Sequence, residues 1–181
     1  DRHVYLVMEY LPGGDLKARM NGALTPGQAL YLTVAAARAL VAIHEAGVMH
    51  LDLKPQNVMF RSDGSLVLLD FGVSLLIDHI SASQLDLAIG TPAYVSPEQV
   101  LGGPRDGRTD LYSLGAILFE MLTGRRMYDA ANVADLLFKH AHEPVPNLPA
   151  ALADYQPLLD RMVAKKPDDR FASARAMLGY I

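Results

Sequence analysis

The sequence contains no cysteine, so its fold cannot depend on disulfide bonds and it offers no thiolate metal ligands. This absence fits a reducing compartment, and we expect a cytoplasmic chain, a location that an anchor elsewhere in a longer protein would change. Positive charge is scarce as well, since 16 Lys and Arg face 20 Asp and Glu and the net charge is −4. That balance gives no sign of a nucleic-acid-binding surface. We expect no membrane-crossing segment, and the first residues, Asp1-Arg2-His3, do not read as a signal peptide.

The composition is that of one globular domain. The chain has 181 residues, of which 51% are hydrophobic and 20% are charged, and it shows no repeat or low-complexity segment. It opens with a β-prone run from Val4 to Met8 that stops at Pro12-Gly13-Gly14. Because a lone strand needs neighbours, we expect this run to be the end of a larger sheet, and to be available for self-association if that sheet is absent.

A long helix is predicted after Thr25-Pro26-Gly27-Gln28, which supplies a cap hydroxyl, a proline at the first helical position and an amide acceptor at the third. Gly47 supplies its stop. The apolar segments 58–60 and 66–69 flank Ser62-Asp63-Gly64-Ser65, a pattern that predicts a β-hairpin.

Further helices are predicted at 109–124, 132–142, 155–164 and from 173 to the end. The helix at 109–124 is apolar on nearly every side, which is typical of a helix buried within its domain. The fold class is therefore mainly α-helical (α+β), with one small β-hairpin.

The candidate chemistry surrounds this hairpin. His50-Leu51-Asp52-Leu53-Lys54-Pro55-Gln56-Asn57 precedes it, and Asp70-Phe71-Gly72 follows it. Because a hairpin brings its ends together, Asn57 and Asp70 are expected side by side, as oxygen ligands for Mg²⁺. Asp52 is a carboxylate suited to an acceptor hydroxyl, and Lys54 is suited to offset the charge of a transferring phosphoryl group. A solvated polar loop explains each residue singly, whereas their combination favours phosphoryl transfer.

These motifs resemble the protein kinase family, and the resemblance covers nearly the whole chain. Residues 50–57 are similar to its catalytic loop, and Asp70-Phe71-Gly72 matches its magnesium-binding motif. Residues 90–99, Gly-Thr-Pro-Ala-Tyr-Val-Ser-Pro-Glu-Gln, look like the substrate-binding end of the activation segment of bacterial serine/threonine kinases. Residues 110–115 resemble the start of the central helix, where the family's aspartate, here Asp110, holds the catalytic loop. Arg170 matches the arginine that pairs with Glu98.

The resemblance implies a serine/threonine protein kinase that transfers the γ-phosphoryl group of ATP to protein hydroxyls. Asp52 would be the base, Asn57 and Asp70 would hold Mg²⁺, and Lys54 and Thr91 would tie the base to the peptide-binding segment. The implied cofactors are ATP and Mg²⁺, and the implied partner is a protein substrate with a Ser or Thr acceptor.

The same resemblance divides the chain into residues 1–14, the last strand of the N-terminal lobe and the hinge, and residues 15–181, the C-terminal lobe. The catalytic loop would be 50–57 and the activation segment 70–98. Met8 would be the gatekeeper, and the backbone of Glu9 and Leu11 would bind adenine. Asp15 would reach the ribose, and Met59 would pack under the adenine ring.

Two departures from the family pattern lead to further expectations. The chain contains no glycine-rich phosphate loop, no strand lysine and no partner glutamate, so we expect the isolated chain to be inactive. Leu51 stands where many kinases have an arginine that grips a phosphate on the activation segment. We therefore expect activity to depend little on phosphorylation at Ser81 or Ser83.

Two alternatives remain open at this point. A small-molecule phosphotransferase uses a similar His-x-Asp loop, but generally lacks a segment like 90–99 and its Glu98–Arg170 anchor. A pseudokinase or docking module is the other alternative, although Asp52, Asn57 and Asp70 are all present. The sequence upstream of Asp1 would decide between an enzyme and such a module.

Overall fold

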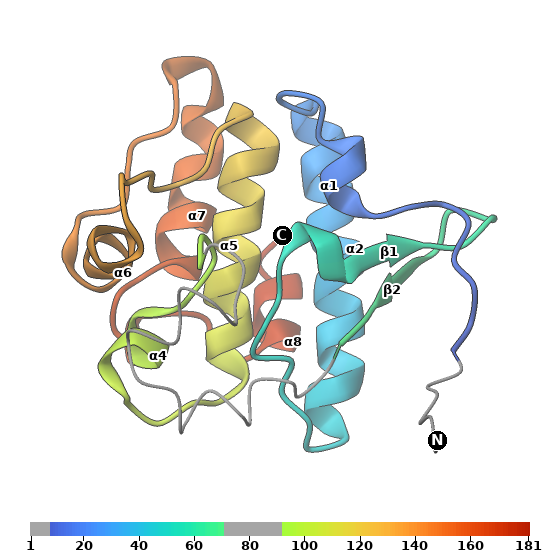
Figure 1. The fold of residues 1–181 in the computed structure, drawn as a ribbon, viewed down its shortest axis with the longest axis horizontal. Helices are drawn as coiled ribbons and strands as arrows, with labels where there is room; N and C mark the ends of the chain where they lie inside the picture. Colours follow the sequence, from blue (N-terminus) through green and yellow to red (C-terminus); the bar gives the residue numbers. More distant parts are fainter. Residues whose placement is uncertain (1–7, 71–91) are drawn as a thin grey trace, which may run out of the picture.

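Helices build most of the part of the chain that the structure, a computed structural model, describes: residues 8–70 and 92–181 (Figure 1). Within these residues, one sheet pairs β1 (Val58–Phe60) with β2 (Leu66–Leu68) in an antiparallel hairpin. The expected mainly helical class with a small hairpin is therefore confirmed. Of the expected first strand, only Met8 falls within the described residues, and its side chain is 55% exposed.

Helix α2 (Pro26–Glu45) begins as its cap sequence predicts. Thr25 and Gln28 form a capping box with Pro26 at the first position, and Gly47 follows the helix with a φ of +76°. By length and composition this helix could span a membrane, a criterion that the core helix of a soluble protein also meets. Here it packs against α5 (Gly107–Thr123) and α8 (Ala174–Leu178), with Ala36, Ala37 and Leu40 buried.

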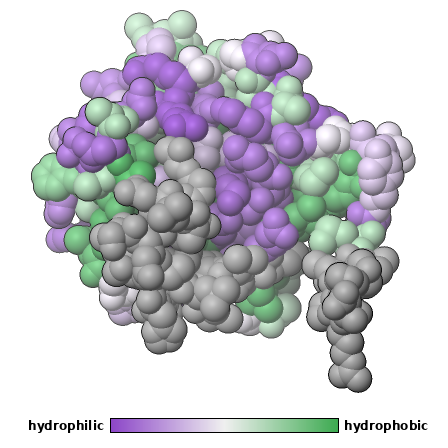
Figure 2. Space-filling view, in the orientation of Figure 1, coloured by the Kyte–Doolittle hydropathy of each residue, from purple (hydrophilic) through white to green (hydrophobic). Residues whose placement is uncertain are grey.

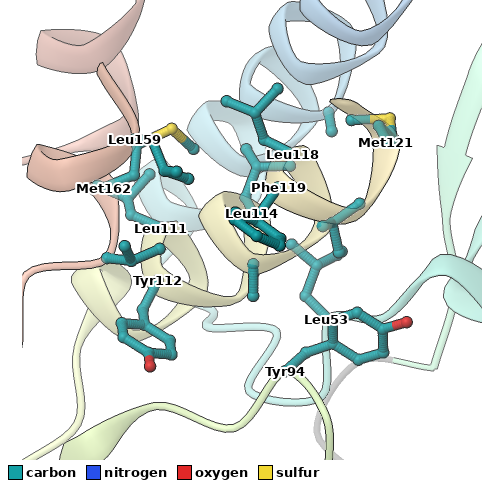
Figure 3. Packing of buried hydrophobic residues seen from close by; sticks show 14 of the residues in the cluster. Leu53, Tyr94, Leu111, Tyr112, Leu114, Leu118, Phe119, Met121, Leu159 and Met162 are labelled. Atoms are coloured by element: carbon teal, nitrogen blue, oxygen red, sulfur yellow. The ribbon is translucent and has the colours of Figure 1, made fainter. Parts of the chain in front are cut away.

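Helix α5 lies at the centre of the core and confirms the helix expected at 109–124. It begins at the Asp106 cap and ends at Gly124, which adopts a φ of +71°. Its apolar side chains pack with α7 (Gln156–Met162) and neighbouring segments, as Figure 3 shows for Leu111, Leu114 and Phe119. Burying each such side chain stabilises the fold by roughly 1.5–3 kcal/mol.

Four buried polar residues interrupt the apolar surface of α5. Thr109, Asp110, Ser113 and Glu120 fall within about 100° of one another around the helix, since each residue adds about 100°. We call this set the polar stripe of α5. Each of its side chains has a hydrogen-bond partner from a loop or a short helix outside α5. The central helix is therefore both the core of the fold and the anchor of its irregular segments.

The remaining elements are short, and they include α6 (Val133–His142), which confirms the helix expected at 132–142. Helices not predicted from the sequence are α1 (Leu16–Arg19), α4 (Pro97–Leu101) and the 3-10 turns η1 (Pro55–Asn57), η3 (Ala150–Tyr155) and η4 (Pro167–Asp169). Two helices were predicted to extend too far at their C-terminal ends. Helix α7 stops at Met162, and beyond it the carbonyl groups of Ala164 and Lys165 accept hydrogen bonds from Arg170. Helix α8 stops at Leu178, before Gly179, rather than at the end of the chain.

The hairpin is fixed to the segment that precedes α1. Gly13 N donates to Phe60 O at 3.0 Å, Phe60 N donates to Gly14 O at 3.0 Å, and Asp15 forms an isolated bridge with Met59. A side chain at Gly13 would lie 2.6 Å from Phe60 O, so this close approach requires glycine. Residues 13–15 of this segment are therefore held beside β1.

Candidate active site

A carboxylate lies at the centre of the loop that leads into the hairpin, residues 50–57, which we call the site loop. Lys54 Nζ contacts Asp52 Oδ2 at 2.7 Å, and Asn57 Nδ2 donates to Asp52 O at 2.9 Å and to Asp52 Oδ2 at 3.2 Å. The Asp52 and Lys54 side chains are 28% and 32% exposed, so both remain open to solvent. Figure 2 shows hydrophilic residues gathered at the centre of the face that carries this loop. The predicted trio of Asp52, Lys54 and Asn57 is thus one cluster.

The two ends of the hairpin lie together as the sequence predicts. Leu69 N donates to Asn57 O at 2.9 Å, directly beyond the pairing of Val58 with Leu68, and Asp70 is the next residue. Asn57 uses its side-chain nitrogen on Asp52, so Oδ1 is the atom of this side chain that could bind a metal ion. Asp70 is exposed and has a φ of +61°. Both side chains carry oxygen atoms, the donor type that Mg²⁺ prefers. Phe71, Gly72, Thr91 and the two serines Ser81 and Ser83 lie outside the described residues.

The backbone of the site loop is held by the polar stripe of α5. Asp110 Oδ2 accepts from His50 N at 2.9 Å, and Asp110 Oδ1 accepts from Leu51 N at 2.8 Å. His44 Nε2 lies 2.7 Å from Asp110 Oδ2. The expectation that Asp110 holds this loop is confirmed. Leu51, the residue before Asp52, has a φ of +63°, a conformation that residues other than glycine rarely adopt.

His50 is a buried residue of this loop rather than an exposed base. Burial lowers the pKa of its imidazole, which outweighs the opposing effects of the Asp110 and Asp52 carboxylates. The ring is therefore neutral at pH 7. A buried, neutral imidazole suits a structural role in the loop better than the role of a base.

A second anchor holds the segment after residue 91. Arg170 donates two parallel hydrogen bonds of 2.8 Å to the carboxylate of Glu98 in α4, and Thr109 Oγ1 donates to the same carboxylate at 2.8 Å. The side chains of Arg170 and Glu98 are 0% and 7% exposed. Burial raises the pKa of Glu98, but the hydrogen bonds and charge of Arg170 outweigh it, and the pKa lies below the ordinary value of 4.5. The predicted Glu98–Arg170 pair is confirmed.

Tyr94, two residues before Ser96, is held by two residues of α5. Ser113 Oγ donates to Tyr94 O at 2.7 Å, and the Tyr94 hydroxyl donates to Glu120 Oε2 at 2.6 Å. Lys17 Nζ in α1 reaches the other oxygen of Glu120 at 2.6 Å. Burial, reinforced by the Glu120 carboxylate, raises the pKa of Tyr94 far above its ordinary value of 10. Tyr94 is therefore protonated and acts as a donor at any physiological pH.

The residues expected to contact a nucleotide lie in the segment that precedes α1 and in β1. Glu9 forms a two-point ion pair with Arg61, at 2.7 and 2.9 Å, and Leu11 is buried. Asp15 Oδ1 accepts from Ala18 N at 2.7 Å and so caps α1, while Met59 is half-buried in β1 opposite it. The structure thus brings Asp15 and Met59 together and fixes the side chain of Glu9 to the hairpin.

Sequence reasoning missed two connections at this site. Gln99 Nε2 donates to Leu51 O at 2.8 Å, and Lys17 pairs with Glu120 across 103 positions of the chain. The helix that carries Gln99 had a signal, because Ser96-Pro97-Glu98-Gln99 repeats the cap pattern of Thr25-Pro26-Gly27-Gln28 and so predicts a helix at 97, but this pattern does not mark the contact with Leu51. No local pattern marks the second.

Comparison with known proteins gives a consistent picture. Residues 1–179 match a family model described as the protein kinase domain. Serine/threonine-protein kinase Pkn1 of Myxococcus xanthus is 39% identical over 181 residues, which cover 95% of this chain and 26% of that protein. Serine/threonine-protein kinase PknL of Mycobacterium tuberculosis is 34% identical over 182 residues, covering 97% of this chain and 46% of that protein. PkaA of Streptomyces coelicolor, a serine/threonine-protein kinase, is 38% identical over 171 residues, with 91% and 31% covered. The chain spans less than half the length of each of these relatives.

Proposed function

This chain belongs to the protein kinase family, and from that premise we propose that it forms the C-terminal lobe of a bacterial serine/threonine kinase. In this proposal residues 1–14 are the last strand of the N-terminal lobe and the hinge, and residues 15–181 are the lobe itself. The complete kinase transfers the γ-phosphoryl group of ATP to Ser or Thr hydroxyls of a protein substrate. The names of the bacterial relatives and the oxygen-rich site around the hairpin support this proposal.

The observation that carries the proposal is the fixed, solvent-open carboxylate of Asp52. Lys54 and Asn57 both contact its Oδ2, which leaves Oδ1 for the hydroxyl of an acceptor. A positioned carboxylate orients that hydroxyl and takes its proton, an effect worth on the order of 10²–10⁴ in rate. Lys54 adds a positive charge beside the phosphoryl group that is transferred.

Asn57 and Asp70 are the residues that would hold Mg²⁺, because they offer oxygen atoms at adjoining ends of the hairpin. The bound ion would neutralise charge on the phosphates. Thr91 would link the base to the peptide-binding segment by resemblance to the family.

The nucleotide would lie against the segment that precedes α1. The backbone of Glu9 and Leu11 would bind adenine, Met59 would pack under its ring, and Asp15 would reach the ribose with the oxygen that does not cap α1. The Glu9–Arg61 ion pair and the backbone hydrogen bonds at Gly13 and Gly14 order this segment in advance. Such ordering reduces the entropy lost on binding.

The test compares two aspartate-to-asparagine variants of the complete kinase that carries this chain. Asp52→Asn should lower phosphate transfer from ATP to a Ser/Thr protein substrate by at least about 10²-fold, with circular dichroism unchanged. Asp154→Asn makes the same chemical change at an exposed position and should leave turnover intact. Near-normal turnover of Asp52→Asn contradicts the proposal.

A further inference from the structure

We propose that Gln99 is a positioning residue for the base. Its side-chain amide holds the backbone at Leu51, next to Asp52, and so makes the orientation of Asp52 depend on α4. This inference rests on the proposed function, because it assigns to Gln99 a part in the reaction of Asp52.

The two ends of the Gln99 amide perform separate tasks. Its Oε1 accepts from Ser96 N at 3.0 Å and from Ser96 Oγ at 3.1 Å, which completes the capping box of α4. Its Nε2 donates to Leu51 O at 2.8 Å, across 48 positions of the chain. The cap requires only an acceptor at this position, so the donor is free to serve the site loop.

Leu51 needs such an external partner because its φ of +63° is unfavourable for a side chain with a Cβ. Its N–H is held by Asp110 Oδ1 at 2.8 Å, and its carbonyl by Gln99 Nε2 at 2.8 Å. Each of the two polar groups of this residue is therefore fixed by a side chain from a distant helix. A conformation of this kind persists only where its surroundings enforce it.

The carbonyl of Leu51 belongs to the peptide plane that continues into Asp52. Because the peptide bond is planar, fixing this carbonyl fixes the direction in which the chain enters Asp52. The adjacent Glu98 is held by Arg170, so α4 itself is rigidly placed. Through its neutral side-chain amide, Gln99 thus makes the orientation of Asp52 depend on the position of α4. The link is a hydrogen bond between two neutral groups, and the Leu51 side chain offers no cation that could grip a phosphate.

A Gln→Glu change at two equivalent caps separates the two tasks. Gln99→Glu keeps the acceptor that the capping box requires but has no N–H for Leu51 O. Gln28→Glu makes the identical change in the capping box of α2, where Gln28 Oε1 accepts from Thr25 N at 3.1 Å and the site loop is not contacted. The two variants therefore match in the chemical change and the cap pattern, and they differ in the link to Leu51 and in burial, since Gln99 is half-buried and Gln28 is exposed.

The experiment measures kcat, the KM for ATP, thermal unfolding and amide hydrogen exchange in the complete kinase. In Gln99→Glu, kcat should fall about 10- to 100-fold, on the scale of small misplacements of reacting groups, with an unchanged KM for ATP. Exchange should accelerate at residues 51–53, while the unfolding midpoint stays close to that of Gln28→Glu. Gln28→Glu should keep the wild-type kcat and the wild-type exchange at residues 51–53.

Two results would overturn the inference: a wild-type kcat in Gln99→Glu, or a loss of kcat that is matched by an equal loss of folded protein. If the wild-type kinase transfers no phosphate, the proposed function fails. The exchange data then test only whether Gln99 holds the backbone at Leu51. Faster exchange confined to residues 51–53 in Gln99→Glu supports this role of the Gln99–Leu51 hydrogen bond, and unchanged exchange refutes it.

Discussion

Replacing Arg170 by methionine would leave the carboxylate of Glu98 buried without its counter-ion. The guanidinium uses all its N–H groups in the fold: two donate to Glu98, and the others donate to the carbonyl groups of Arg108, Ala164 and Lys165. In Arg170→Met, Glu98 keeps the hydroxyl of Thr109 as its side-chain donor. Removing one partner of a buried ion pair typically costs about 3–5 kcal/mol, a large part of the ~5–15 kcal/mol that stabilises a domain.

The pH dependence of this loss has a defined sign. In the wild type the pKa of Glu98 is lowered, so the pair stabilises the fold above pH 4.5 and this contribution is lost as the pH falls through the lower, folded-state pKa. Without Arg170, burial is opposed only by the smaller effects of the Thr109 and backbone hydrogen bonds, and we expect it to raise the pKa of Glu98. At acid pH the carboxylate becomes protonated, which removes the unpaired buried charge and part of the destabilisation of the variant. The difference in unfolding free energy between wild type and Arg170→Met should therefore shrink from pH 7 to pH 4.5.

Urea unfolding followed by circular dichroism at these two pH values tests both statements. Asp168→Asn is the control, because the Arg108–Asp168 ion pair at 2.7 Å has an 89% exposed aspartate and should contribute less than about 1 kcal/mol. Glu98→Gln combined with Arg170→Met should recover part of the loss, since no buried charge remains. A loss below about 1 kcal/mol in Arg170→Met, or a difference that grows in acid, would refute this reasoning.

Three further perturbations test other parts of the fold. Asp110→Asn should lower the unfolding free energy by about 1.5–3 kcal/mol, the range for a hydrogen bond to a charged group, and denaturant titration should show it; an unchanged midpoint would contradict the role of Asp110 in holding the site loop. Gly115→Ala places a Cβ 2.5 Å from Val163 Cγ1 and should cost about 1–3 kcal/mol, whereas Gly27→Ala enters open space and should not destabilise; equal midpoints would argue against tight packing of α5 on α7. Burial lowers the pKa of His140 to about 3 from 6.5, so stability falls on acidification through this window by up to about 1.4 kcal/mol per pH unit, and His140→Phe should flatten that slope in an unfolding series.

Much of the fold could be predicted because its signals are local. Thr25 and Asn132 stand at the helix starts that the sequence predicts, and the turn at residues 62–65 lies between two strands of three residues each. Helix α1 could not be predicted in the same way, since its four residues are too few to show a helical period. Helix α4 does carry a local signal, because Ser96-Pro97-Glu98-Gln99 is a capping sequence like the one that begins α2.

The candidate site divides in a similar manner. The hairpin makes the adjacency of Asn57 and Asp70 predictable from chain order, and the resemblance supplied Asp110 and the Glu98–Arg170 pair. The contacts of Gln99 with Leu51 and of Lys17 with Glu120 depend on how distant segments pack, and neither partner carries a pattern that identifies the other. The left-handed conformation of Leu51 is also a product of this packing, because leucine does not favour it by itself.

The polar stripe of α5 has a consequence for how this protein can change length. Asp110 holds the site loop, Ser113 and Glu120 hold Tyr94, and a helix turns by about 100° for each residue. One residue inserted between Asp110 and Glu120 would rotate the later anchors away from their partners and disrupt the apolar packing as well. Residues added to the turn at 62–65 would extend an exposed loop and disturb neither. Deletions and insertions should therefore be tolerated in the hairpin turn and rejected within α5.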